Sequence, residues 1–281
     1  MGKKKITLAN EFKARAYEKI FEGRCVEEGE LYRVMDQWAS VIVKDVDDLY
    51  HRKMGRTSLI DVKRTEDEEK KEDIERMISY LMSYPAIVNY FRSLSEMNRS
   101  GFVAGIFMIY GWMPRVLRLN CGETLKEGDF IEIRDFLLKL QRCGLPEALD
   151  CLDEGGVQSL EKLRHLTNNS VVGMSKLLHF INPIVFPMYD SNLGEIFGGF
   201  NDSSSYVEYV KGFNDICLEF ASDISKFGRS ERVVNLKVKF GYDEKFVLSY
   251  VRLVESMLFC LGKNIKRKRE EGSKQKKGAK V

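Results

Sequence analysis

The sequence contains no Cys-x-x-Cys pair, only three histidines and five prolines, and no uncharged apolar run long enough to cross a bilayer. A membrane-spanning helix needs about 20 apolar residues. The longest apolar segments, Phe102–Met113 and Val247–Leu261, are too short or carry charges. The basic N-terminus is not followed by the apolar segment of a secretion signal. We therefore expect a cytoplasmic protein with no membrane segment. It would be associated with the nucleoid, or would be nuclear if the protein is eukaryotic.

The cysteines and histidines do not form the patterns of a metal site or of a disulfide framework. Six cysteines stand at 25, 121, 143, 151, 217 and 260, and four of them lie inside apolar helical patterns. Buried free thiols in a reducing compartment are the better interpretation. The histidines are too scattered for a zinc site, and an iron–sulfur cluster needs closely placed cysteines. We expect no cofactor and no metal.

Positive charge is concentrated at the C-terminus. Residues 263–281 hold nine Lys or Arg against two Glu, a net charge of +7, which leaves −4 on the other 262 residues of a chain whose total is +3. Because this segment is so polar, it cannot bury enough apolar area to fold alone. We therefore expect a disordered tail. It either binds polyanions in a salt-dependent way or remains a solvated terminus. For the first alternative the candidate residues are Lys266, Arg267, Lys268 and Arg269.

Apolar residues recur at spacings of three and four along most of the chain, which predicts an all-α protein of roughly ten helices. The alternating, β-branched run from Val233 to Phe240 is the one strand candidate. Pro85 is expected to kink or end a helix. The expected helices span 7–22, 28–54, 66–85, 86–96, 100–113, 129–142, 146–153, 157–167, 174–181, 203–226 and 243–262.

The domain organisation is less marked. The clearest apolar gap near the centre is Cys121–Gly128, which we expect to be a loop. The chain therefore forms either one domain over 1–262 or two helical lobes, 1–120 and 121–262, followed by the tail. Residues 1–120 carry no motif that indicates a role.

The most informative stretch is 170–199, where turn residues precede an apolar helix. Thr-Asn-Asn-Ser at 167–170 is typical of a turn between two helices. The free N–H groups of the second helix, near Gly173 and Ser175, are suited to bind a phosphate, with Lys176 adding positive charge. The alternative is an ordinary helical corner whose N–H groups are capped by Ser170.

Asp190 follows the apolar segment Phe186–Tyr189 and precedes a short helical pattern. It is predicted to cap that helix, which stabilises a helix by about 1 kcal/mol. In an open cleft, the same carboxylate is also suited to act as a general base or as an electrostatic stabiliser.

The order of these motifs resembles the helix-hairpin-helix DNA glycosylase superfamily, which includes the endonuclease-III-type and adenine-mismatch glycosylases. In that family a hairpin of pattern Leu-Pro-Gly-Val-Gly-x-x-Thr-Ala precedes an apolar helix. An invariant Asp follows about twenty residues later, within a segment such as Phe-Pro-Ile-Leu-Asp-Gly-Asn-Val in adenine-mismatch enzymes. Residues 186–193, Phe-Pro-Met-Tyr-Asp-Ser-Asn-Leu, match that segment. The hairpin here keeps only one of the two glycines, Gly173, and the resemblance covers about residues 160–199.

The resemblance implies catalytic roles for two residues. Asp190 would stabilise the positive charge that develops on the sugar as the base leaves, and would help to activate the attacking water. Asn192 matches the Asn that follows the family's Asp by two residues. In members that also cut the strand, a lysine stands two residues after the second glycine. That position here is Ser175, so the resemblance implies a glycosylase without lyase activity.

The resemblance also implies that the hairpin holds the phosphates of a DNA strand. Ser170, the backbone of Val172 and Gly173, and Ser175 would take that role. Lys176 is then expected to be a phosphate contact or a surface lysine.

Three functions are therefore open. The leading hypothesis is a DNA glycosylase that releases a modified or mismatched base flipped out of the duplex. The second is a non-catalytic nucleic-acid-binding or defence protein of the same fold, and the third is a helical protein-interaction module. The cluster Tyr110-Gly111-Trp112-Met113-Pro114 is either a base-stacking platform or part of the core. His179 is expected to be a hydrogen-bonded core histidine.

Overall fold

The computed structural model describes residues 7–22, 26–40, 66–94, 96–112, 127–153, 155–243 and 245–278. All regular structure in these ranges is helical, which confirms the prediction of an all-α protein. Residues 30–40 form one helix. The other helices are α1 (Leu8–Phe21), α3 (Glu66–Ser93), α4 (Arg99–Trp112), α5 (Glu127–Arg142), α6 (Leu145–Asp153), α7 (Gly156–Leu166), α8 (Val171–Ile181), α9 (Ser191–Phe197), α10 (Ser203–Glu219), α11 (Ala221–Gly228), α12 (Glu231–Lys239) and α13 (Tyr250–Gly278).

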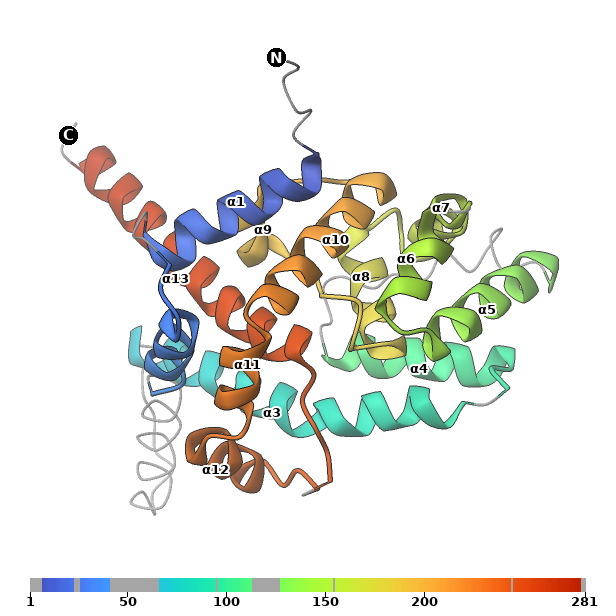
Figure 1. The fold of residues 1–281 in the computed structure, drawn as a ribbon, viewed down its shortest axis with the longest axis horizontal. Helices are drawn as coiled ribbons and strands as arrows, with labels where there is room; N and C mark the ends of the chain where they lie inside the picture. Colours follow the sequence, from blue (N-terminus) through green and yellow to red (C-terminus); the bar gives the residue numbers. More distant parts are fainter. Residues whose placement is uncertain are drawn as a thin grey trace.

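Helix α8 lies at the centre of the fold (Figure 1). All of its residues except Val172 are buried, and α3, α4, α5, α7 and α10 pack around it. A helix that is enclosed on all sides is normally apolar all round. The polar side chains that α8 carries therefore lie inside the protein, and each requires a partner there.

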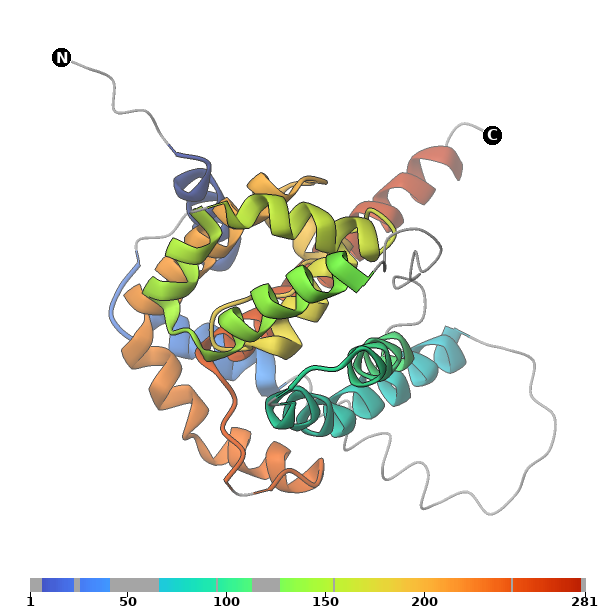
Figure 2. The ribbon, with the colours of Figure 1, turned by 90° about the vertical axis from the view of Figure 1, so that its right-hand side faces the viewer.

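The beginning and the end of the chain close over the same core. Helix α1 packs along α10 and touches α9, whereas α13 packs against α9, α10 and α11 (Figure 1). Helices α3 and α4 lie side by side on one flank (Figure 2). One cluster of buried hydrophobic side chains extends from Phe12 on α1 to Leu258 on α13. The boundary expected at 121–128 stays a prediction, because residues 113–126 lie outside the described ranges.

The predicted strand at 233–240 is wrong, because residues 233–239 belong to helix α12 and Phe240 is the residue directly after it. Ser230 caps this helix, since its Oγ accepts the N–H of Val233 at 3.5 Å. The β-branched residues favoured a strand, but a strand needs a neighbour to satisfy its backbone groups. The described part of the chain contains no strand that provides one, whereas a helix satisfies these groups internally.

The predicted disorder of the C-terminal tail is also wrong as far as Gly278. Helix α13 begins at Tyr250, has its buried segment from Val251 onward, and continues without a break into the basic residues. Adding residues to an existing helix avoids the unfavourable nucleation step, and Lys, Arg, Glu and Gln all have high helix propensity. The low apolar content of the tail is therefore compatible with order.

Several predicted boundaries shift. Pro85 lies inside α3 without ending it, so the two helices expected on either side of it are one. The helix predicted at 203–226 is divided at Phe220 into α10 and α11. The helix predicted from residue 243 begins only at Tyr250. The expectations for residues 41–54 and 57–64 lie outside the described residues.

Candidate functional site

The helical hairpin predicted ahead of the apolar helix is present as α7, a tight turn and α8. Asn168 and Asn169 both adopt the left-handed backbone conformation, with φ of 60° and 57°, which asparagine tolerates well. Ser170 Oγ accepts the N–H of Gly173 at 3.1 Å. A Cβ atom on Gly173 would lie 3.0 Å from that of Thr167, so this turn favours glycine. Ser170 thus occupies one of the N–H groups that a bound anion would use.

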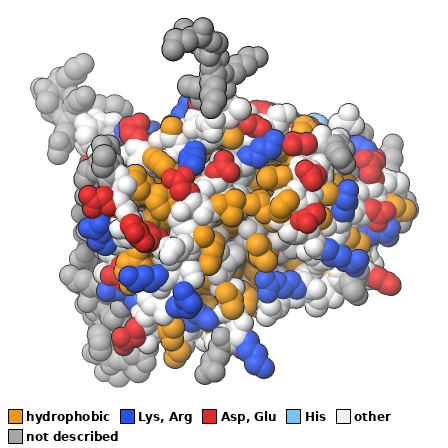
Figure 3. Space-filling view, in the orientation of Figure 1, with side chains coloured by type: hydrophobic (Ala, Val, Ile, Leu, Met, Phe, Trp, Pro, Cys, Tyr) orange, Lys and Arg blue, Asp and Glu red, His pale blue; other side chains and the backbone are white. Residues whose placement is uncertain are grey.

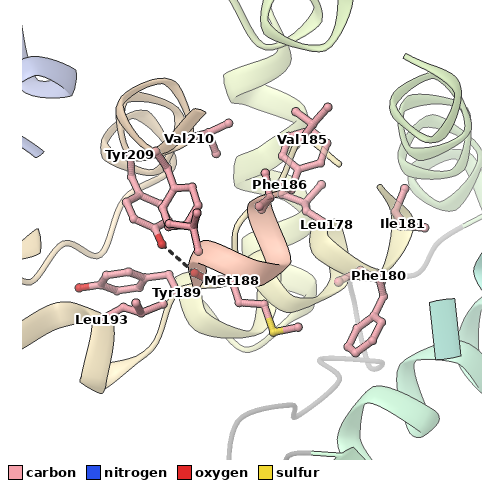
Figure 4. Packing of buried hydrophobic residues seen from close by; sticks show 14 of the residues in the cluster. Leu178, Phe180, Ile181, Val185, Phe186, Met188, Tyr189, Leu193, Tyr209 and Val210 are labelled. Carbon is pink, nitrogen blue, oxygen red and sulfur yellow. Dashed lines mark hydrogen bonds between the residues drawn. The ribbon is translucent and has the colours of Figure 1, made fainter. Parts of the chain in front are cut away.

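Buried tyrosine hydroxyls hold the backbone that leads to Asp190. Tyr206 donates a hydrogen bond from its hydroxyl to the Pro187 carbonyl at 3.0 Å, and Tyr209 donates to the Met188 carbonyl at 2.8 Å. Figure 4 shows the second of these bonds, with the residues around it drawn from the core between α8, α9 and α10. Because α10 supplies both donors, the position of Asp190 is fixed by the packing of a whole helix.

Ser175 fixes the same segment from the side of α8. Its Oγ accepts the N–H of Tyr189 at 2.9 Å and lies 2.9 Å from the Val172 carbonyl, to which it donates. Ser175 has no exposed surface. The expectation that it contacts a phosphate is therefore wrong, because its hydroxyl is enclosed and is used to join α8 to the residue before Asp190.

Asp190 caps α9, as one of the two alternatives predicted. Its Oδ1 accepts the N–H groups of Asn192 at 2.9 Å and of Leu193 at 3.0 Å. The side chain is partly exposed, and its second oxygen, Oδ2, accepts no hydrogen bond from the described residues. Asn192, the other predicted catalytic residue, is also partly exposed. The carboxylate therefore keeps one oxygen available after capping its helix.

Lys176 is the residue that departs most from expectation. It is 1% exposed, and its Nζ has no hydrogen-bond partner among the described residues. Burial lowers the pKa of Lys176 to about 8, against the opposing effect of the negative charges of Asp190 and Glu255. It is not a surface lysine, because α8 is surrounded by other helices. Lys176 lies between two largely apolar segments, 171–174 and 177–181, and this position is the signal in the sequence that predicts burial.

Glu255 of α13 contacts the segment that leads to Asp190. Glu255 is 3% exposed; its Oε1 accepts from Arg252 Nη1 at 2.7 Å and its Oε2 accepts the N–H of Met188 at 3.4 Å. Burial raises the pKa of Glu255 to about 7, although the charge of Arg252 opposes this. Arg252 and Glu255 were not among the predicted site residues. The signal in the sequence is a pair of oppositely charged residues three positions apart within an apolar helical stretch.

His179 is a buried, hydrogen-bonded core histidine, as predicted. Its Nδ1 lies 2.8 Å from the Phe186 carbonyl and donates to it, so Nε2 accepts from the Tyr84 hydroxyl at 2.8 Å. Burial holds the pKa of His179 well below its usual value, and Arg252 adds to this effect. The neutral imidazole thus links α8 to α3 and to the segment before Asp190.

The structure separates the predicted hairpin contacts into two groups. Gly173 and Lys176 are buried, together with Ser175, so these residues do not meet a strand on the surface. Ser170 and Val172 are partly exposed at the start of α8, and their role in holding a strand stays a prediction.

The basic residues of the tail are placed by α13. Arg267, Lys268 and Arg269 are exposed and Lys266 is half-buried; Arg269 pairs with Glu195 of α9 at 2.8 Å. Their binding of nucleic acid stays a prediction. Tyr110 on α4 is 38% exposed, so the interpretation as a core residue is wrong for it.

Among the hollows on the surface are two that described residues line. One, of about 590 Å³, lies between α5 and α6, where Lys139, Arg142 and Glu147 line it. The other, of about 510 Å³, lies between α1, α6 and α10, on the face where hydrophobic, acidic and basic side chains are interspersed (Figure 3). Asp190 lines neither of them.

The structure thus defines a helical protein whose central hairpin helix carries a buried lysine beside a capping aspartate. Comparison with protein-family models, with curated proteins and with solved structures finds no match for the chain. Among the described helices, none combines the length and the apolar character of a membrane span. The same ranges hold no cluster of His, Cys, Asp or Glu suited to a metal ion. The four described cysteines, Cys143, Cys151, Cys217 and Cys260, are free thiols.

Proposed function

We propose that this protein binds DNA and hydrolyses the N-glycosidic bond of a modified or mismatched base that is flipped out of the duplex. The observation that supports this best is that Asp190 caps α9 with Oδ1 alone, so that Oδ2 accepts no hydrogen bond from the described residues. The negative charge of Asp190 also acts on the pKa of the enclosed Lys176, whose Nζ has no hydrogen-bond partner among the described residues. Buried polar groups without partners are rare in proteins, and ionisable groups with strongly shifted pKa values cluster at functional sites.

Asp190 has the role of an electrostatic stabiliser in this proposal. As the bond between the sugar C1′ and the base nitrogen breaks, the base leaves with the bonding electrons and positive charge develops on the sugar. A carboxylate fixed by two backbone N–H groups needs no reorganisation to stabilise that charge. A water molecule then adds to C1′ and releases a proton, while the departing base takes one up.

Lys176 supports the site from within. An enclosed ammonium without a hydrogen bond lowers the free energy of unfolding, so Lys176 makes the folded protein less stable. The negative charges of Asp190 and Glu255 both favour the protonated form of Lys176, so its positive charge balances theirs. Tyr206, Tyr209 and Ser175 have no part in the chemistry and act by fixing the backbone before Asp190.

The test is release of free base from duplex oligonucleotides that each carry one modified or mismatched base. Asp190→Asn is the informative variant, because Asn caps helices as well as Asp does but carries no charge. We expect the rate of base release to fall by about 100- to 1,000-fold, the range for loss of one electrostatic stabiliser.

Asp202→Asn is a matched control. Asp202 caps α10 through the same type of bond, with Oδ1 accepting the N–H of Ser205 at 2.7 Å, but it lies outside the candidate site. This variant is expected to release base at the wild-type rate. Equal rates for wild type and Asp190→Asn, or no release from any duplex, would contradict the proposal.

A second candidate function is that of a nucleic-acid-binding protein of the same architecture without catalysis. It is favoured by the capping role of Asp190 and by the absence of this residue from the two hollows that described residues line. It predicts salt-dependent binding of DNA with no release of base from any duplex of the series.

A further inference from the structure

Helix α13 has two parts with different surroundings. From Val251 to Leu258 it contributes to the hydrophobic core. Its C-terminal part, residues 263–278, extends beyond the body of the protein (Figures 1 and 2). At 1.5 Å per residue, this extension is roughly 24 Å long.

The extension leaves the body beside the candidate site, in a fixed orientation. At Gly262 a Cβ atom would overlap the carbonyl oxygen of Asn192, two residues after Asp190, so α13 touches the first turn of α9 directly. Arg269 Nη1 then pairs with Glu195 Oε2 of α9 at 2.8 Å. Because Gly262 and Arg269 are seven residues apart, or about two turns, they lie on one side of α13 and fix its rotation.

The sequence of the extension is basic overall. Over residues 263–273, whose side chains the structure describes, five Lys or Arg stand against two Glu, and one of these, Glu271, lies 3.8 Å from Arg267. Residues 263–278 include eight Lys or Arg against two Glu. Lys263, Arg267 and Lys268 are exposed. Phosphates of one DNA strand recur about every 3.4 Å along the helix axis, so 24 Å corresponds to about seven of them.

We propose that residues 263–278 form a rigid arm that binds the phosphate backbone of nucleic acid on the α9 side of the Asp190 site. This rests on the proposed function, because the arm would hold the strand from which Asp190 receives a nucleotide. A nucleic acid fits better than a membrane surface. A helix that lies on a membrane needs an exposed apolar face, and Ile265, the one large apolar residue of the extension, is half-buried.

The first test measures the salt dependence of DNA binding by fluorescence anisotropy, using an unmodified labelled duplex. The variant is Lys263→Gln/Arg267→Gln/Lys268→Gln. The control is Lys237→Gln/Lys239→Gln/Lys245→Gln, which removes the same charge on α12 and after it, away from the arm (Figure 1). The slope of log affinity against log salt should become less steep by about 2 to 3 in the first variant. An equal change in both variants would overturn the proposal.

The second test separates a rigid arm from a flexible charged tail. Asn264→Pro keeps every charge but interrupts α13 ahead of the basic run that begins at Lys266, since proline breaks a helix interior. We expect at least a fivefold loss of affinity, whereas Asn264→Ala should bind as wild type does. A Gly-Ser-Gly insertion after Lys263 replaces the proline variant if that variant fails to fold. Wild-type affinity in these interrupted helices would overturn the rigid arm.

The two proposals fail separately in these assays. Binding with the expected slopes but without release of base would retain the arm and remove the catalytic function. Base release with unchanged slopes in the arm variant would do the opposite. Binding to vesicles with anionic lipids, but not to DNA, would overturn the choice of nucleic acid as the partner.

Discussion

Lys176 is a charged side chain enclosed within the core around α8, and its burial affects both its protonation and the stability of the fold. The ammonium is enclosed, its Nζ has no hydrogen bond, and only the charges of Asp190 and Glu255 favour its protonated form. Burial outweighs those charges, because the pKa is lowered and not raised. A residue that destabilises the fold in this way is expected to have a functional role.

Replacing Lys176 by methionine should therefore stabilise the protein at pH 7, by about 1–3 kcal/mol. The difference in free energy of unfolding between Lys176→Met and the wild type should become smaller as the pH rises. The unfolded chain keeps the proton of Lys176 up to its ordinary pKa of 10.5, whereas the folded chain releases it near pH 8. Between these values the unfolded state binds more protons, so the free energy of unfolding of the wild type rises with pH. Urea unfolding of both proteins from pH 7 to 10 measures this.

The exposed lysine on α7, Lys162, provides the control. Lys162→Met should change the free energy of unfolding by at most about 0.5 kcal/mol at either pH, as is usual for a surface position. A Lys176→Met protein that is less stable than wild type at pH 7 would mean that the ammonium is well compensated, and would remove the argument from Lys176 for a functional site.

At the scale of elements, the contact between α13 and α9 is the closest approach next to the candidate site. Gly262→Ala should destabilise the protein by about 1–3 kcal/mol or more, because the added methyl meets the backbone of Asn192, which cannot rotate away as a side chain can. Chemical denaturation measures the loss. The affinity for DNA should fall as well, since the arm is oriented by this contact.

Gly272→Ala on the same helix is the matched control. A Cβ atom there meets nothing within 4 Å, so the change should leave stability unchanged or increase it by up to about 1 kcal/mol through better helix propensity. If Gly262→Ala behaved like Gly272→Ala, the close packing of α13 on α9 would be wrong.

Helix periodicity alone predicted most of the elements around the site, because amphipathic stretches such as α5 and α7 report directly which face is buried. The same pattern failed where context decides. The β-branched residues of α12 form a helix because the described chain offers no partner strand, and the basic tail is helical because it continues α13.

The candidate site was predictable only in part. Asp190 as a helix cap follows from local sequence, and the structure has that bond. Glu255, which Arg252 binds on the same helix, acts on Lys176 from more than 70 positions along the chain, and no local pattern specifies that approach. Each of these charged residues nevertheless interrupts an apolar run, which marks burial although it does not identify the partner.

For the molecule as a whole, the question is whether the N-terminal helices form a lobe of their own. Phe12 of α1 is 3% exposed and packs against the rings of Phe200 and Tyr209, with ring centres 5.5 and 6.1 Å apart. Helix α1 also passes so close to α10 that a Cβ atom on Gly212 would lie 2.6 Å from the Ala9 carbonyl oxygen. The structure therefore predicts that α1 and the residues around Asp190 unfold together.

Phe12→Ala tests this by leaving a cavity between α1 and the core. The expected loss is about 3–5 kcal/mol, the usual cost of removing a buried phenylalanine side chain, and it should lower the midpoint of one cooperative transition. Phe107→Ala on α4, where the ring is 61% exposed, should change that midpoint little. Following unfolding by circular dichroism and by fluorescence separates the alternatives. If residues 1–120 formed an independent lobe, Phe12→Ala would lower one transition and leave a second, from residues 121–262, at its wild-type midpoint.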